Sequence, residues 1–132
     1  MRPENLNVLG NSYAVTWHKK KLPSDKRGHW GLCYKDERKI QIRIHNQEDF
    51  NIDTLFHEWA HACLHEFKAP ELLTEEQVAE YIGTGMMKLL KENPGLREWL
   101  LQIDWSNFNH SSWKAQSFEI PSRAEIIYLY AN

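Results

Sequence analysis

The stretch LFHEWAHACLHEF, residues 55–67, contains three histidines, the first of them followed directly by a glutamate, at spacings that could bind a metal ion. His57 and His61 are four residues apart, so a helix places them one turn apart on the same face. Two imidazoles in that arrangement can bind one Zn²⁺ at ~2.0–2.1 Å, and zinc lowers the pKa of a coordinated water to ~7. Glu58 lies next to the first histidine, where its carboxylate can take a proton from that water. The HExxH pattern therefore predicts a hydrolytic zinc site with Glu58 as its general base.

A further histidine, His65, repeats the spacing, but a straight helix keeps it away from the same ion. Eight residues separate it from His57, which is ~12 Å along the helix axis at a rise of ~1.5 Å per residue. We therefore expect His65 to form a hydrogen bond to one of the metal ligands without binding the metal, to line the cleft, or to be an exposed side chain. A helix whose histidines bind no metal is the competing interpretation. It is disfavoured because the whole pattern lies within one otherwise apolar helical segment.

The strands expected to position this helix come before it in the chain. Three segments are predicted to be strands, and in the first and the last of them apolar and polar residues alternate, most strictly at Ile40, Ile42 and Ile44, as in half-buried strands. The segments are 12–17, 29–34 and 38–45. The last two flank the charged turn KDE and predict a β-hairpin, and we expect all three strands to be antiparallel.

The helix that carries the histidines is expected to begin at Asp53 or Thr54, because either side chain can cap the free backbone N–H groups at a helix start. It should end near Phe67, since Pro70 disfavours continuation. Apolar residues occupy most of the circumference of this helix. The polar side that carries Glu58 and the histidines therefore needs partners.

Two more helices are expected after it. Thr74 and Gln77 have the spacing of a capping box, which predicts a helix that runs to the NPG sequence at 93–95. The segment 96–103 is typical of a third helix. The pattern is weaker beyond it, where EIIYLY, residues 125–130, fits either a late strand or a short helix.

Length and composition limit the number of domains. A chain of 132 residues, of which 42% are hydrophobic and 26% charged, is long enough for one core and too short for two. We expect one domain, residues 1–132, of the α+β class. In it a short, mostly antiparallel sheet packs on the HExxH helix, and the two further helices complete the fold.

Charge, hydropathy and cysteine content exclude several functional classes. The formal net charge of -2 leaves no broad basic surface, so no nucleic-acid partner is expected. No segment approaches the ~18 consecutive apolar residues of a membrane span, so no membrane partner is expected. The two cysteines, Cys33 and Cys63, are too few for a disulfide framework. These features predict a soluble protein of the cytoplasm, and they do not indicate its oligomeric state.

The order of hairpin, HExxH helix, short loop and acid-bearing second helix resembles the minimal zincin metallopeptidases. The resemblance is to gluzincin-like small peptidases of phage and bacterial genomes, including the ImmA/IrrE group. In that family a glutamate of the second helix is the third zinc ligand, in a pattern such as E-x-x-A-[ND], and EEQVAEYIG at 75–83 is similar. The resemblance implies that Glu76 is the third ligand. It also implies that Glu80 accepts the outer N–H of a ligating histidine, and that Gly83 lets the two helices pack closely.

Two other third ligands stay open on the sequence. His110 could fold back from the C-terminal part of the chain, and Cys33 lies upstream of the helix, as the ligating cysteine does in peptide deformylases. A group that stabilises the transition state is not evident. Tyr34, Tyr128 and Tyr130 are candidates for that role, as is His110.

The function implied by the resemblance is hydrolysis of a peptide bond in a protein or peptide substrate. Zincin substrates commonly add along an edge strand beside the cleft, which 29–34 or 38–45 could provide. An alternative from another functional class is a zincin-derived interaction module that keeps the metal for folding and cleaves nothing. Glu58 favours the enzyme, because a purely structural zinc site has no use for a base.

Overall fold

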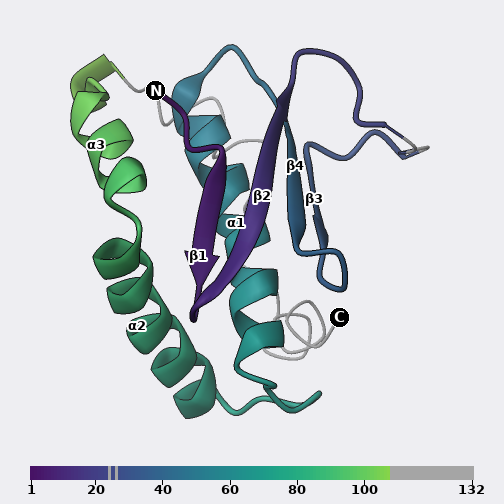
Figure 1. The fold of residues 1–132 in the computed structure, drawn as a ribbon, viewed down its shortest axis with the longest axis vertical. Coiled ribbons are helices and arrows are strands. Elements are labelled where there is room, and N and C mark those ends of the chain that lie inside the picture. Colours follow the sequence, from purple (N-terminus) through teal and green to yellow (C-terminus); the bar gives the residue numbers. More distant parts are fainter. Residues whose placement is uncertain (24, 26, 108–132) are drawn as a thin grey trace.

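The computed structural model describes residues 1–107 except Ser24 and Lys26, and in this part the protein is an α+β fold (Figure 1). The strands are β1 (Asn5–Val8), β2 (Asn11–His18), β3 (Gly31–Tyr34) and β4 (Lys39–Arg43). The helices are α1 (Glu48–Glu66), α2 (Glu75–Glu92) and α3 (Pro94–Gln102), followed by a 3-10 turn at Trp105–Asn107. The expected element at 125–130 lies outside the described residues. No helix in the described ranges is long and apolar enough to span a membrane.

The sheet is mixed, with strand order β1-β2-β4-β3. The predicted hairpin is confirmed, because β3 and β4 pair antiparallel. The expectation that all three predicted strands are antiparallel is wrong, since β2 and β4 pair in parallel, with Val15 opposite Ile40. The reason lies in burial. Ile40, Gln41 and Ile42 of β4 are all buried, so this strand takes a central place in the sheet and separates β2 from β3.

The sequence pattern missed the first strand. β1 pairs antiparallel with β2 through a two-residue turn in which Leu9 and Gly10 have φ values of 51° and 81°. Two positive φ values are typical of the type I′ turns that connect tight hairpins. Leucine is an unusual residue at such a position, so this turn carried little signal.

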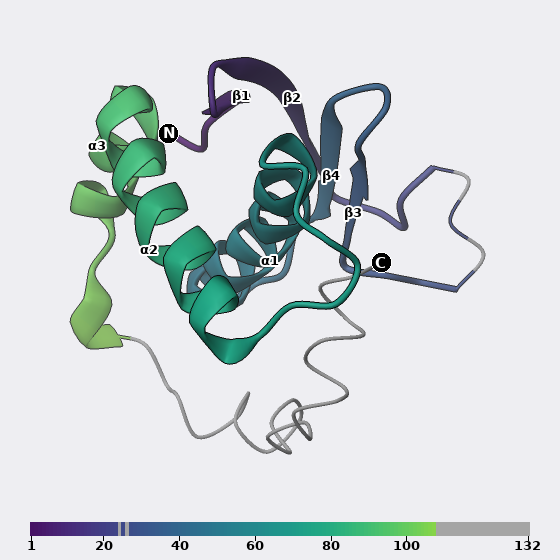
Figure 2. The same ribbon diagram turned by 90° about the horizontal axis from the view of Figure 1, so that it is seen from below.

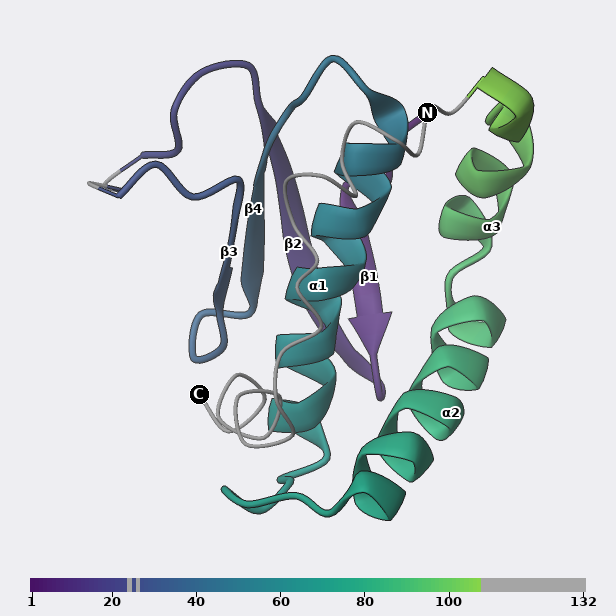
Figure 3. The same cartoon turned by 180° about the vertical axis from the view of Figure 1, so that it is seen from behind.

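All three helices lie on one side of the sheet. Figure 2 shows the strands curving around α1, with α2 and α3 on the β1 side of that helix, and Figure 3 shows α1 lying across the face of the sheet. Inward-facing residues of the sheet meet apolar residues of the helices in one cluster. Its buried members include Tyr13, Val15, Ile40, Ile42, Leu55, Trp59, Ala62, Leu89 and Trp99.

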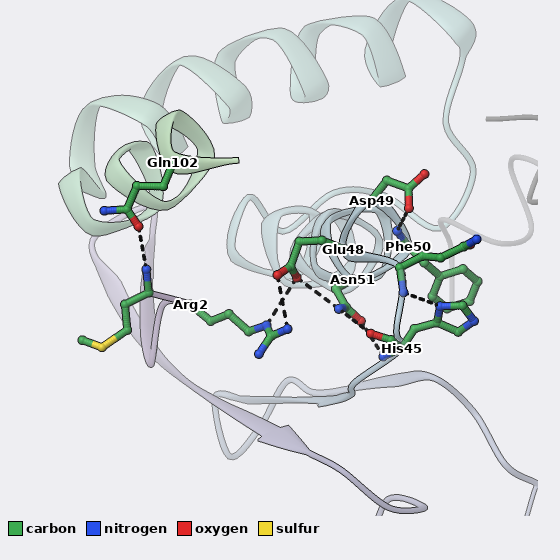
Figure 4. Close-up of polar contacts among 9 residues, drawn as sticks. Arg2, His45, Glu48, Asp49, Phe50, Asn51 and Gln102 are labelled. Atoms are coloured by element: carbon green, nitrogen blue, oxygen red, sulfur yellow. Dashed lines mark hydrogen bonds and ion pairs between the residues drawn. The ribbon is translucent and has the colours of Figure 1, made fainter. Parts of the chain in front are cut away.

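Helix α1 begins at Glu48, a turn and a half before the predicted start at Asp53 or Thr54. Its first turn is held by tertiary contacts and not by a side-chain cap (Figure 4). Asn51 is fully buried and accepts a hydrogen bond from the backbone N–H of His45 at 2.7 Å. Arg2 forms an ion pair with Glu48 at 3.2 Å. Arg2 is distant in sequence from α1, and His45 lies in the loop before it. A search of the sequence for a local capping residue therefore could not find where α1 begins.

The other end of α1 is anchored to the sheet through Glu66. The hydroxyl of Tyr13 donates to one carboxylate oxygen at 2.7 Å, and the side-chain amide of Asn11 donates to the other at 2.8 Å. Arg38 adds an ion pair at 3.1 Å. α1 is therefore fixed against β2 and the β3–β4 turn at the end that follows the HExxH sequence.

Helix α2 begins with the predicted capping box. The Thr74 hydroxyl oxygen accepts a hydrogen bond from the backbone N–H of Gln77, and the side-chain oxygen of Gln77 accepts one from the backbone N–H of Thr74. The glycine that brings it close to α1 is Gly85 and not Gly83 as predicted. A Cβ atom at Gly85 would lie 2.6 Å from the Cys63 sulfur, whereas one at Gly83 would meet nothing within 4 Å. Two residues correspond to ~200° around a helix, so Gly83 faces away from α1.

Candidate metal centre

The two histidines of the HExxH sequence and the glutamate between them converge on α1. One ligand atom from each of His57, Glu58 and His61 can be chosen so that all three lie within 4.8 Å of one another. The imidazole centroids are 5.0 Å apart. Two donors bound to one zinc at ~2.1 Å are at most ~4.2 Å apart, so small side-chain rotations would suffice. The group could therefore hold a metal ion.

Glu58 is buried against the sheet, and Gly31 makes this possible. The side chain of Glu58 is only 4% exposed, and its Oε2 atom has no hydrogen-bond partner among the described residues. A Cβ atom at Gly31 of β3 would lie 2.9 Å from Glu58 Cγ and 2.7 Å from Thr54 Cγ2. Only glycine leaves room for the carboxylate beneath this strand. An unpartnered buried oxygen next to two imidazoles indicates a site for a proton or a cation.

Burial shifts the pKa values of Glu58 and His61 in opposite directions. It raises the pKa of Glu58 to about 7, against a smaller lowering by the charge of His29. It lowers the pKa of His61 to about 4, helped by the neighbouring charges of His57 and Lys35. Without a metal, His61 is therefore a neutral imidazole at pH 7, which is the form that binds zinc.

His29 and Trp30, which the sequence pattern did not single out as site residues, help to line the approach to Glu58. A hollow of about 210 Å³ is bounded by His29 and Trp30 before β3 and by Asp53, Thr54 and His57 of α1. His29 is paired through Nδ1 with Asp25 at 3.0 Å. His29 and Asp25 lie in the loop before β3 and belong to no recognisable sequence motif. Only the folded structure shows that they lie near the site.

The other predicted site residues lie apart from the group of three. His65 is exposed, one turn beyond His61. Cys33 lies on the inner face of β3 and is half-buried, and burial together with the charge of Glu58 raises the pKa of its thiol to about 12. This thiol is therefore protonated at neutral pH in the metal-free protein. His110, Tyr128 and Tyr130 lie outside the described residues.

Glu76 and Glu80 are exposed on α2 and do not join the group. Val78 and Ile82 of the same helix line a crevice against Trp59 and Ala60 of α1 and so mark its inner side. Glu76 and Glu80 are two residues away from these positions, which places them ~160° around the helix from the contact. Their predicted roles stay predictions.

Tyr34, the described candidate for stabilising a transition state, sits on the far side of the sheet. In β3 its neighbour Cys33 faces α1, and successive residues of a strand point to opposite faces. The ring of Tyr34 lies instead under the ammonium of Lys39, 4.7 Å from its centroid.

Comparisons with family models, with curated proteins and with solved structures give no match to this chain.

Proposed function

We propose that the protein is a zinc-dependent metallopeptidase that hydrolyses peptide bonds in the cytoplasm. The observation that carries the proposal is the convergence of His57, Glu58 and His61 within 4.8 Å, with the carboxylate buried against β3. Zinc bound by the two histidines would polarise the substrate carbonyl and make water acidic enough to be deprotonated near neutral pH. The free cysteines Cys33 and Cys63 agree with a reducing compartment.

Glu58 transfers the proton in this proposal. Its carboxylate lies beside the imidazoles and has an oxygen without a partner in the described part of the chain. It can therefore accept a proton from the attacking water and return it to the leaving amine. A positioned base of this kind typically contributes ~10²–10⁴-fold to the rate.

Strand β3 offers the backbone that would align a substrate. It is the last strand of the sheet, so no described strand pairs with its outer edge. Glu58 packs directly under Gly31 of this strand. An extended peptide that adds to the edge would thus place a carbonyl group next to the base, and the substrate is a protein or peptide in an extended conformation.

The third zinc ligand in the proposal is Glu76, on the resemblance alone. Because this side chain faces away from α1, α2 would have to turn about its axis for Glu76 to bind. Chelator competition can decide the matter. If Glu76 is a ligand, Glu76→Ala releases zinc as readily as His61→Ala does, whereas Glu80→Ala weakens binding only ~10–100-fold. If Glu76→Ala holds zinc like the wild type, the third ligand is another group.

A metal-stabilised interaction module is the second candidate function. It is favoured by the position of the Glu58 carboxylate, which lies close enough to both imidazoles to be a ligand itself. A site in which Glu58 binds the ion has no free base and would stabilise the fold without catalysis.

Glu58→Gln separates the two functions. In a peptidase the variant keeps stoichiometric zinc, measured by elemental analysis, and loses ~10²-fold or more of its rate on an extended peptide. In a module the variant loses zinc, because an amide is a poorer ligand than a carboxylate. Glu98→Gln, the same chemical change at an exposed position of α3, is the matched control and should retain both properties. A His57→Ala, His61→Ala double variant with unchanged zinc content would refute the site itself.

A further inference from the structure

Two hollows flank the HExxH group along β3, and their charges differ. The first, described above, lies at the beginning of the strand and includes Asp53. The second, of about 260 Å³, lies between the β3–β4 turn and the end of α1. It is lined by Lys35, Leu64, His65, Lys68, Ala69, Pro70 and Glu71. A peptide on the outer edge of β3 would pass from one hollow to the other across Glu58.

The second hollow is basic. Lys35 and Lys68 line it together with His65, and Glu71 is the one acidic residue among the lining groups. Lys35 follows β3 directly, and its charge contributes to the low pKa of His61, so it lies close to the candidate metal centre. His65 is one helical turn from His61, and its side chain is exposed. The positive charge is therefore adjacent to the site where a peptide bond would be cleaved.

The first hollow has no comparable excess of positive charge. The imidazole of His29 is paired with Asp25, whose side chain is only 5% exposed, and Asp53 adds a carboxyl group on the opposite wall. An acidic side chain would thus be attracted to one end of the cleft and not to the other. This difference can set the register of a bound peptide.

We propose that this cleft selects peptides with an acidic side chain about two residues from the cleaved bond, received by the basic hollow around Lys68. The spacing follows from the fold, because His65 is one turn, ~6 Å, beyond His61, and an extended peptide advances ~3.3 Å per residue. An aspartate or glutamate at that distance meets Lys68 while the peptide backbone pairs with β3. The cleavage part of this inference rests on the proposed function, but the preference for acidic peptides can be measured without turnover.

The test is binding of fluorescein-labelled nine-residue peptides to zinc-loaded Glu58→Gln protein, followed by fluorescence anisotropy. Each peptide holds glutamate, glutamine or lysine at one variable position and is otherwise identical to the rest. Two sets are compared, with the variable position about two residues before the centre in one set and about two residues after it in the other. We expect the glutamate peptide to bind about 3- to 10-fold more tightly than the glutamine peptide at low salt, with the advantage reduced in ~0.5 M salt. Wild-type protein stripped of metal provides a second measurement of the same preference.

Three further variants test whether the basic hollow causes the preference for the glutamate peptide. Lys68→Glu should abolish it, and Lys91→Glu, the same charge change in the last turn of α2, should leave it intact. Glu71→Gln removes the acid of the basic hollow and should tighten binding of the glutamate peptide, a gain that misfolding cannot produce.

Equal binding of the glutamate and glutamine peptides, or a preference that survives Lys68→Glu, would overturn the inference. Failure of the proposed function looks different. In that case the wild type cleaves none of the peptides, while the binding preference and its dependence on Lys68 persist. Cleavage of all the peptides at equal rates, with equal binding, would leave the peptidase standing and refute the acidic preference.

Discussion

Replacing Glu58 by glutamine should stabilise the metal-free protein, by an amount that depends on pH. Burial raises the pKa of this carboxyl group to about 7 from the 4.5 of an exposed glutamate. The folded protein therefore keeps its proton to a higher pH than the unfolded chain. The contribution of Glu58 to stability is fully present below pH 4.5 and is lost as the pH rises through about 7.

The size of the effect follows from the same two values. The interval between 4.5 and about 7, at ~1.4 kcal/mol per pKa unit, corresponds to about 3 kcal/mol above pH 7. Glutamine has nearly the same shape and does not ionise, so it escapes this penalty. The variant should match the wild type at pH 4.5 and exceed it by up to about 3 kcal/mol at pH 8.

Urea unfolding of protein treated with a chelator, followed by tryptophan fluorescence between pH 4.5 and 8, measures the difference. His61, whose pKa burial lowers to about 4, also makes stability depend on pH, but it is present in both proteins and cancels. Glu76→Gln, an exposed position on α2, is the matched control and should show no pH-dependent gain. A difference between Glu58→Gln and the wild type that stays constant over this range would refute the burial argument.

Four other substitutions test the packing that positions the site. Gly31→Ala should destabilise the protein by ~1–3 kcal/mol in urea unfolding and lower its zinc affinity, because a Cβ atom there would lie within 3 Å of side-chain atoms of α1. Gly85→Ala should destabilise the protein by a similar amount, whereas Gly83→Ala on the open side of the same helix should raise the free energy of unfolding by ~0.5–1 kcal/mol. Tyr13→Phe removes the hydrogen bond to Glu66 and should lower the thermal midpoint, corresponding to ~1 kcal/mol, with zinc content unchanged.

Local patterns predicted the elements better than their arrangement. Alternating isoleucines in 38–45 identified β4, and the capping box at Thr74 identified the start of α2. The start of α1 was missed because Asn51 and Glu48 bind the preceding loop and the N-terminal segment instead of capping the helix. The parallel pairing of β2 and β4 was missed because strand order depends on which strand is most deeply buried, and periodicity does not report that.

The sequence by itself determined which side chains could hold a metal ion. His57 and His61 share a face of α1 because a helix turns ~100° per residue, and no tertiary contact is needed for that. Tertiary structure decided what surrounds them. Gly31 buries Glu58, and the packing of Gly85 on Cys63 turns Glu76 away from the group. Backbone hydrogen bonding repeats locally and can be read from spacing, whereas the side of a helix that meets its neighbour depends on the fit of side chains distant in sequence.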